Sequence, residues 1–190
     1  FAQGHGDAYG HGFVLQGPER FALTGRNGVG KTRLVETLIH PRVVSAGEPM
    51  AASSTGRIGF QPQRLDHLDD DLTLMEAVRR GAPHARPADI RANLARFLFR
   101  GDVVERRIGA LSGGERFRAA LAVILLADPP PELLVLDEPT NNLDLASVNE
   151  LVDALASYRG GLIVVSHDEG FLARVGIDTW ITLERDGRLR

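Results

Sequence analysis

The sequence predicts an α/β domain in which a mostly parallel sheet is combined with a small helical lobe. Two observations lead to this fold class. Short, continuously apolar runs alternate with helix-like periodicity, and a glycine-rich loop joins the first run to the first helix. Continuous apolar runs suit parallel strands, because helices cover such strands on both faces. The expected strands are residues 21–25, 55–60, 133–136, 162–165 and 180–183, the last of which closes a hairpin with Gly187.

Helices are expected where apolar residues recur at spacings of three and four positions. They are residues 31–39, 72–80, 88–100, 115–127 and 146–158. The second, third and fourth of these are separated by breaks that contain glycine. We therefore expect a single domain over residues 1–190, with a helical lobe at about residues 65–128.

The start of the chain, about residues 1–12, is rich in glycine and histidine and shows little apolar periodicity. We expect an irregular, frayed segment there. His5 and His11 are an alternative signal, because together they could hold a metal ion. A flexible glycine-rich end is the favoured interpretation.

The composition is that of an ordinary globular protein, with 43% hydrophobic and 25% charged residues. The absence of cysteine excludes disulfides and thiolate metal sites. The longest apolar run, near residues 119–127, is far shorter than the roughly 18 residues of a membrane span, so no direct membrane insertion is expected. The chain opens without the pattern of a secretory signal, and a cytoplasmic location is expected. A net charge of −3 argues against specific DNA binding over the whole domain.

The basic residues are distributed unevenly between the two types. Lys31 is the only lysine among 22 lysines and arginines. Arginine carries a rigid planar fork, whereas lysine is a compact charge on a flexible stem. A chain that uses arginine everywhere else therefore needs a point charge at position 31.

The glycine-rich loop supplies the context for that charge. Residues 25–32 read Gly-Arg-Asn-Gly-Val-Gly-Lys-Thr, which satisfies G-x-x-x-x-G-K-[ST] between a predicted strand and a predicted helix. In such a loop, backbone N–H groups surround phosphate oxygens at a helix N-terminus, the lysine reaches the β- and γ-phosphates, and the hydroxyl binds Mg²⁺. A glycine turn that merely starts a helix would leave the lone lysine unexplained. The sequence thus predicts a P-loop NTPase fold with these nucleotide-binding residues: Gly25, Arg26, Asn27, Gly28, Val29, Gly30, Lys31, Thr32 and Arg33.

Two adjacent carboxylates, Asp137 and Glu138, follow the buried strand 133–136. Ligands bind at the carboxyl edge of open α/β sheets, and neighbouring carboxylates in an apolar setting are costly without a cation or a reacting water. Asp137 is therefore expected in the magnesium shell, and Glu138 is expected to orient and polarise a water. The alternative is an acidic pair that only caps the following Pro139-Thr140.

Further polar residues lie at the ends of other predicted helices and strands. Ser112 is a plausible helix N-cap in Ser112-Gly113-Gly114-Glu115, Asp144 closes the segment 141–144, and His167 follows the strand 162–165. Each of these signals is weak alone, since a histidine at a strand end is more often structural than catalytic.

Taken in order, these segments resemble the nucleotide-binding domain of the ATP-binding cassette (ABC) superfamily over about residues 13–183. They correspond to the Walker A loop (25–32), the Q-loop glutamine (Gln63), the signature (111–115), Walker B (133–138), the D-loop (143–144) and the switch histidine (His167). Residues 137–144 and 165–172 look like subfamily F, the soluble ribosome-associated members. Transporter subunits usually show Ser-Ala where this chain has Asn141-Asn142.

The resemblance implies an ATPase that uses ATP and Mg²⁺ and in which two cassettes meet head to tail. It implies that Lys31 holds ATP in the same chain and that Thr32, Gln63 and Asp137 surround the metal. Glu138, His167 and Gln63 are the implied catalytic residues. The resemblance implies that the signature residues act across the interface, namely Ser112, Gly113, Gly114 and Glu115. It implies that Asp144 of the D-loop links the two sites.

The resemblance leaves several assignments open. Subfamily F proteins usually carry two cassettes and a helical linker, so one cassette without a linker indicates a fragment, with the second cassette in the same chain or in a homodimer. A ribosome-associated ATPase of translation or antibiotic resistance is preferred over a transporter subunit or a fragment that binds nucleotide without turnover. Gln61 competes with Gln63 as the Q-loop residue, and Phe1 is the candidate for the aromatic that stacks on adenine.

Overall fold

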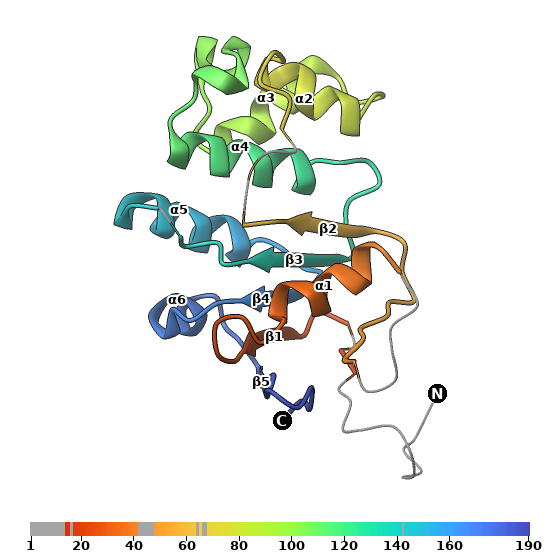
Figure 1. The fold of residues 1–190 in the computed structure, drawn as a ribbon. Coiled ribbons are helices and arrows are strands. Elements are labelled where there is room, and N and C mark those ends of the chain that lie inside the picture. The colour runs from red at the N-terminus through yellow and green to blue at the C-terminus, as the bar shows by residue number, and fades with distance from the viewer. Residues whose placement is uncertain (1–13, 16, 42–47, 64, 66–67, 142) are drawn as a thin grey trace.

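The computed structural model describes residues 14, 15, 17–41, 48–63, 65, 68–141 and 143–190. These residues form one sheet of five parallel strands in the order β2-β3-β4-β1-β5 (Figure 1). The strands are β1 (Arg20–Thr24), β2 (Ile58–Gln61), β3 (Leu133–Asp137), β4 (Gly161–Val165) and β5 (Thr179–Thr182). The predicted α/β class with a parallel sheet is confirmed. Because all five strands run the same way, their carboxyl ends lie at one edge of the sheet.

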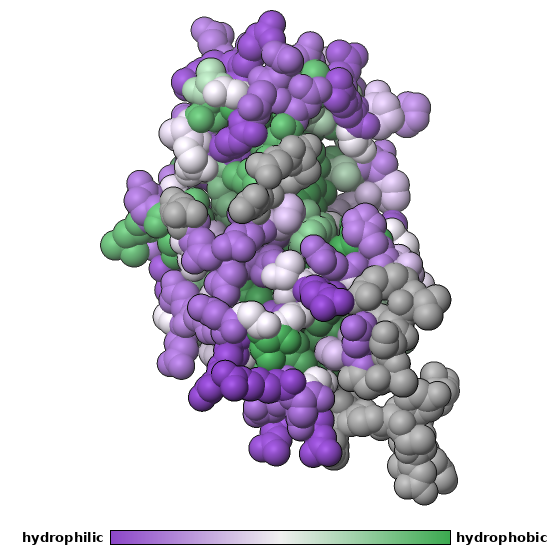
Figure 2. Space-filling view, in the orientation of Figure 1, coloured by the Kyte–Doolittle hydropathy of each residue, from purple (hydrophilic) through white to green (hydrophobic). Residues whose placement is uncertain are grey.

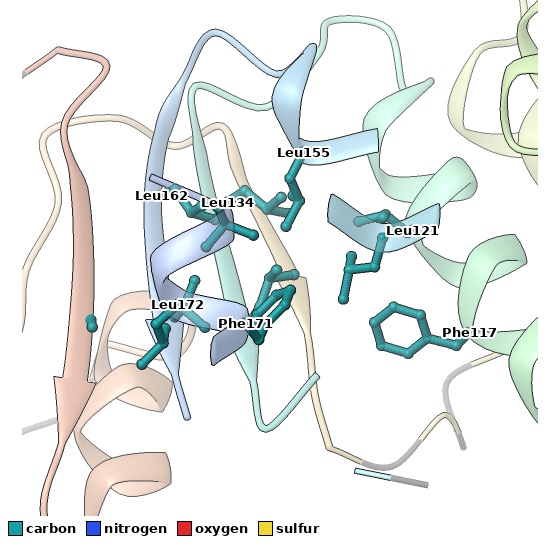
Figure 3. Close-up of a cluster of buried hydrophobic side chains, with 12 residues drawn as sticks. Phe117, Leu121, Leu134, Leu155, Leu162, Phe171 and Leu172 are labelled. Carbon is teal, nitrogen blue, oxygen red and sulfur yellow. The ribbon is translucent and has the colours of Figure 1, made fainter. Parts of the chain in front are cut away.

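Helices cover both faces of this sheet. Helix α1 (Lys31–Ile39) packs Leu34, Val35 and Leu38 onto one face. The opposite face is covered by α4 (Gly113–Leu125), α5 (Leu145–Ala156) and α6 (Glu169–Arg174). Figure 3 shows this second core, where Phe117, Leu121, Leu155, Phe171 and Leu172 surround Leu134 and Leu162 of the central strands. Since alternate strand residues enter different cores, the same strands are apolar throughout.

The predicted helical lobe has a core of its own. It contains α2 (Leu74–Gly81), α3 (Pro87–Arg96) and the short 3₁₀ helices η1 (Gly101–Glu105) and η2 (Ile108–Ala110). Helix α4 belongs to both parts, because Phe117 and Leu121 enter the sheet core while Ala119 and Ala122 enter the lobe core. Helix α4 therefore joins the packing of the lobe to that of the sheet.

Two local details differ from the sequence expectations, and a third is confirmed with an additional pairing. The helix expected at 88–100 ends at Arg96, because Leu98 adopts a left-handed φ of 64° and Gly101 one of 60°. Helix α6 was not expected, since six residues are too few to show a helical period. The hairpin at the end of the chain is confirmed by the antiparallel pairing of Leu183 with Leu189, but β5 itself pairs in parallel with β1.

Some expectations concern residues outside the described part of the chain. They are the irregular segment at about 1–12, the alternative metal pair His5 and His11, and the adenine-stacking candidate Phe1. Across the described residues, no helix has both the length and the apolar character that crossing a membrane requires.

Candidate nucleotide-binding site

The loop between β1 and α1 is shaped by three glycines. Gly25, Gly28 and Gly30 have φ angles of 137°, 76° and 105°, a region that side chains with a Cβ rarely adopt. A Cβ on Gly28 or Gly30 would meet nothing within 4 Å, so glycine is needed there for the backbone conformation. At Gly25 a Cβ would also lie 2.5 Å from the carbonyl oxygen of Leu183. The sequence thus specifies an open loop directly before the start of α1.

Lys31 lies at the first position of α1 and is only 7% exposed. Its Nζ donates to the carbonyl oxygens of Gly25 at 2.8 Å and Arg26 at 3.3 Å. The same Nζ lies 2.9 Å from Nε2 of His167. The ammonium group of Lys31 is a donor only, so Nε2 of His167 is the acceptor in this contact. The lone lysine and the predicted switch histidine are therefore in direct contact.

Thr32 and Asp137 form the second contact between the loop and the sheet. The Thr32 hydroxyl donates to Oδ2 of Asp137 at 2.7 Å, while Oδ1 of Asp137 is buried and has no hydrogen-bond partner in the described structure. Burial raises the pKa of the Asp137 carboxyl, and the Thr32 hydroxyl and Lys31 oppose that rise. A buried carboxylate oxygen without a partner is costly, and a bound cation would remove that cost.

These two residues fit the ligand preference of magnesium. Mg²⁺ takes oxygen ligands and usually binds through one or two protein groups together with substrate phosphates. Among the described residues there is no group of three or more histidine, aspartate or glutamate residues that could form a metal cage. Thr32 and Asp137 therefore suit a metal that is held jointly with a phosphate ligand.

Glu138 follows directly and has a left-handed φ of 47°, which is uncommon for a residue with a side chain. Its N–H donates to the carbonyl oxygen of Val165 at 2.8 Å, which fixes this turn against β4. Its Oε1 lies 3.6 Å from Nε2 of His167. Burial raises the pKa of the Glu138 carboxyl, with His167 and then Lys31 acting in the opposite direction. A carboxylate with a raised pKa is a better proton acceptor near neutral pH than an ordinary glutamate.

The two candidate Q-loop glutamines have different surroundings. Gln61 ends β2 beside Leu136 and is completely buried. Its Nε2 donates only to the carbonyl oxygen of Pro62 at 3.3 Å, and its Oε1 has no partner in the described residues. Gln63 lies just beyond the strand and is exposed. Only Gln63 is therefore free to turn toward a ligand without repacking the interior.

The predicted signature residues lie at the start of α4, on the face of the sheet opposite α1 (Figure 1). Ser112 caps the helix, accepting from the Glu115 N–H at 3.3 Å, and its own N–H donates to the Glu115 carboxylate at 2.8 Å. That backbone hydrogen bond is the main reason why the pKa of Glu115 is lowered. Ser112 and Gly113 are exposed, and no hydrogen bond joins them to the phosphate loop within the described structure.

The predicted D-loop residue has a similar position at the start of α5. Asp144 is exposed and accepts from the Ser147 N–H at 2.8 Å, which lowers the pKa of its carboxyl. The next residue, Leu145, is 74% exposed. Figure 2 shows apolar surface at its left side, where Figure 1 places α5 in the same orientation.

Other predicted residues are placed less directly. Arg26 and Asn27 are exposed on the loop, Val29 packs against the core under α1, and Arg33 is turned toward Glu48 at 3.6 Å. The sequence assigns no role to Ser166, which is fully buried and whose hydroxyl accepts from the Asp168 N–H. Its place before His167 was the available signal.

A separate groove of about 930 Å³ lies on the α1 face at the opposite, amino end of the strands. Leu15, Leu38 and Leu133 are among its mostly apolar lining residues. None of the predicted nucleotide-binding or catalytic residues lines it, so the groove is distinct from the phosphate loop.

Comparison with known proteins decides the family. Residues 11–141 match the family model described as ABC transporter. The chain belongs to the ABC transporter family. This cassette is 38% identical over 163 residues to YdiF of Bacillus subtilis (86% of this chain, 25% of YdiF). It is 35% identical over 158 residues to ABC transporter F family member 5 of Arabidopsis thaliana (83% of this chain, 22% of that protein).

These relatives confirm the predicted resemblance to subfamily F, and the cassette spans about a quarter of their length. Among solved structures, its fold is similar to a metal-chelate type ABC transporter in an inward-facing conformation. The TM-score is 0.74 at 21% identity, covering 94% of this chain and 73% of that one. The family assignment makes this chain an ATP-binding domain of the P-loop NTPase fold.

Proposed function

We propose that this cassette binds MgATP at the phosphate loop and hydrolyses it when a second cassette completes the site. The observation that carries the proposal is the buried Oδ1 of Asp137, which has no hydrogen-bond partner among the residues the structure describes, while the other oxygen of Asp137 accepts from Thr32 of the loop. The lone lysine lies beside them. A triphosphate with Mg²⁺ requires backbone N–H donors, a positive charge and an oxygen ligand for the metal. The glycine loop, the buried ammonium group and the Asp137 carboxylate supply these three groups.

In this proposal the loop and Lys31 hold the β- and γ-phosphates, and Thr32, Asp137 and Gln63 hold the metal. The magnesium ion, when bound, neutralises phosphate charge and so favours nucleophilic attack. Lys31 exchanges its hydrogen bonds to Gly25, Arg26 and His167 for bonds to phosphate oxygens. The loop thereby exchanges internal hydrogen bonds of Lys31 for hydrogen bonds to the bound phosphate.

Glu138 accepts the proton of the attacking water in this scheme. The oxygen of that water forms a bond to the γ-phosphorus, and the bond to the bridging oxygen of ADP breaks. The position of Glu138 beside His167, together with its raised pKa, supports the general-base role. His167, released from Lys31, is free to donate to the γ-phosphate. Gln63 senses the presence of the same phosphate group.

The second cassette supplies Ser112, Gly113, Gly114 and Asp144 of its own chain. Support comes from the exposure of these helix starts and of Leu145, on the face of the sheet opposite α1. The partner is either a second cassette of a longer protein or another copy of this chain.

For the whole protein, we propose a soluble, cytoplasmic, ribosome-associated factor of translation, with a role in antibiotic resistance as an extension of it. The subfamily F names among the relatives and the Asn-Asn-Leu-Asp sequence at 141–144 support this proposal. The energising subunit of a membrane transporter is the second candidate, because the family model is that of ABC transporters. Cosedimentation of the full-length protein with ribosomes in the presence of ATP supports the first candidate, and its absence favours the second.

The ATPase proposal is tested by phosphate release measured over a wide range of protein concentration. The specific activity should be low at nanomolar protein and should rise with concentration, because mass action fills the pair. Lys31→Ala is the control for contaminating ATPases. Brisk turnover strictly proportional to nanomolar protein would contradict the need for a second cassette. If ATP binding is saturable but no phosphate is released at any protein concentration, the cassette binds ATP without hydrolysing it.

A further inference from the structure

Two contacts join α4 and α5 near the starts of these helices. At the first, Gly114 approaches the hydroxyl of Ser147 so closely that a Cβ on residue 114 would overlap it. About one helical turn further along both helices, Arg118 forms an ion pair with Glu150. The two contacts lie along the same helix pair and begin next to Ser112 and Asp144, the residues that cap these helices.

Arg118 is more enclosed than the surface ion pairs of the lobe. Its side chain is 17% exposed and that of Glu150 is 28% exposed, against 66% and 93% for Arg107 and Asp71. The Arg118 guanidinium also lies 5.5 Å from the ring centre of Phe99, a fully buried residue of the lobe core. One side chain thus connects the lobe, α4 and α5.

An enclosed ion pair is a poor way to gain stability, because removing both charges from water offsets much of their attraction. The buried Nε of Arg118 even lacks a hydrogen-bond partner among the described residues. The pair instead restricts the orientation of the Arg118 side chain. The planar guanidinium contacts a carboxylate on one side and an aromatic ring on one face, so it has little freedom to move. This favours a role in orientation.

We propose that Arg118 is a positioning residue that, through Glu150, holds the starts of α4 and α5 as one rigid surface, so that Ser112 and Asp144 act together on the nucleotide of the other cassette. The inference rests on the proposed pairing of two cassettes. It predicts that damage at Arg118 impairs the site of the partner and spares the phosphate loop of its own chain, since among the described residues the ion pair and ring contact of Arg118 are made to Glu150 and Phe99 and not to that loop.

The test uses two inactive forms of the chain that complement each other. Lys31→Ala removes the phosphate loop function but keeps the helix starts, whereas Ser112→Ala keeps the loop and damages the helix start. Their equimolar mixture should form one working site and release phosphate. Arg118→Met, which keeps the apolar stem and removes the fork, is then added to one or the other chain, and MgATP binding of each chain is measured separately.

With Arg118→Met in the Lys31→Ala chain, the mixture should lose about tenfold in turnover, because a small misplacement of the helix starts costs that much or more. With Arg118→Met in the Ser112→Ala chain, turnover should stay within about twofold of the parent mixture, since that chain contributes only its loop. Glu150→Gln should give the same asymmetry. The matched control, Arg107→Met, removes an exposed lobe arginine and should change neither arrangement.

The possible failures are distinguishable. Equal losses in both arrangements would overturn the inference, because they would show that Arg118 serves only to fold the chain. Turnover that stays at the parent level in both arrangements would overturn the inference as well. A parent mixture of Lys31→Ala and Ser112→Ala without activity would instead contradict pairing between two copies of this chain, and with it the inference as stated for such a pair.

Discussion

The phosphate-loop edge and the starts of α4 and α5 are built in different ways. At the loop, hydrogen bonds join residues far apart in the sequence: Lys31 with His167, and Thr32 with Asp137. At the helix starts, Ser112 and Asp144 bond to groups three residues away. The first region depends on the whole sheet, whereas the second needs only its own helices and their mutual contact.

This difference shows which half of the proposed site the chain completes by itself. The loop edge holds a lysine, a hydroxyl and two carboxylates in place, with one carboxylate oxygen left without a partner. At the helix starts, the side chains of Ser112 and Asp144 accept hydrogen bonds from the first backbone N–H groups of α4 and α5. The remaining surface of these helix starts faces outward. Changes at the loop should therefore act within one chain, and changes at the helix starts should act on its partner.

The largest expected effect is on turnover, at Glu138. Glu138→Gln preserves the shape of the side chain and removes the charge that accepts the proton of the water, so hydrolysis should fall by about 10²–10⁴-fold. MgATP affinity should change little, because the loss falls on the chemical step. Phosphate release and nucleotide titration measure the two quantities. Glu169→Gln, an exposed glutamate at the start of α6, is the control; a wild-type rate for Glu138→Gln would exclude it as the general base.

The next effect concerns binding at the loop edge. Lys31→Arg keeps the charge but replaces a point donor by a planar fork in a site that is only 7% exposed. Affinity for MgATP should fall roughly ten- to hundredfold, the value of a charge-assisted hydrogen bond. The reverse change at an exposed position, Arg79→Lys, should leave titration curves unaltered. Equal affinities of wild type and Lys31→Arg would remove the phosphate-binding role of Lys31.

At Asp137 the structure predicts opposite effects on stability and on metal-dependent binding. Because burial raises the pKa of this carboxyl, its ionised form destabilises the nucleotide-free fold, and that penalty disappears as pH falls through the raised pKa toward the unfolded value. Asp137→Asn should therefore melt at a higher temperature than wild type at pH 8, with the difference shrinking in acid. The same variant should lose the gain in ATP affinity that Mg²⁺ gives. A lower melting temperature at pH 8 would show that the carboxylate is already stabilised.

The smallest effect separates two neighbouring glycines at the start of α4. Gly114→Ala places a methyl group against the Ser147 hydroxyl, whereas Gly113→Ala meets nothing within 4 Å. Gly114→Ala should cost about 1 kcal/mol of unfolding free energy, the low end for overpacking, and Gly113→Ala should cost nothing. Chemical denaturation measures both. Adding Ser147→Ala to Gly114→Ala should restore most of the loss, and a failure to do so would place the strain elsewhere.

The sequence predicts the loop edge well because its signals are local. A strand, three glycines and a lysine within a short stretch specify the phosphate loop, and the acidic pair after an apolar strand specifies the place where Thr32 meets Asp137. The predicted strands and helices match the structure to within a few residues at their ends, since each has a clear period or apolar run.

What the sequence does not predict are contacts that depend on how distant segments meet. Nothing local to Arg118 indicates that it pairs with Glu150, 32 positions away, and lies over Phe99. The contact of Lys31 with His167, the burial of Gln61 and the turning of Arg33 toward Glu48 depend in the same way on tertiary packing. The roles assigned to the site residues therefore stay predictions that the experiments above address.

The claim that one chain completes only half of each ATP site is tested most directly by a molar mass. Glu138→Gln removes a negative charge from beside the γ-phosphate and slows hydrolysis, so ATP should accumulate at the interface and hold two chains together. Size-exclusion chromatography with light scattering should then give twice the 20.6 kDa of one chain with MgATP, and a single chain without nucleotide or when Ser112 is also replaced by arginine. A species of one chain that retains MgATP at every protein concentration would contradict the account.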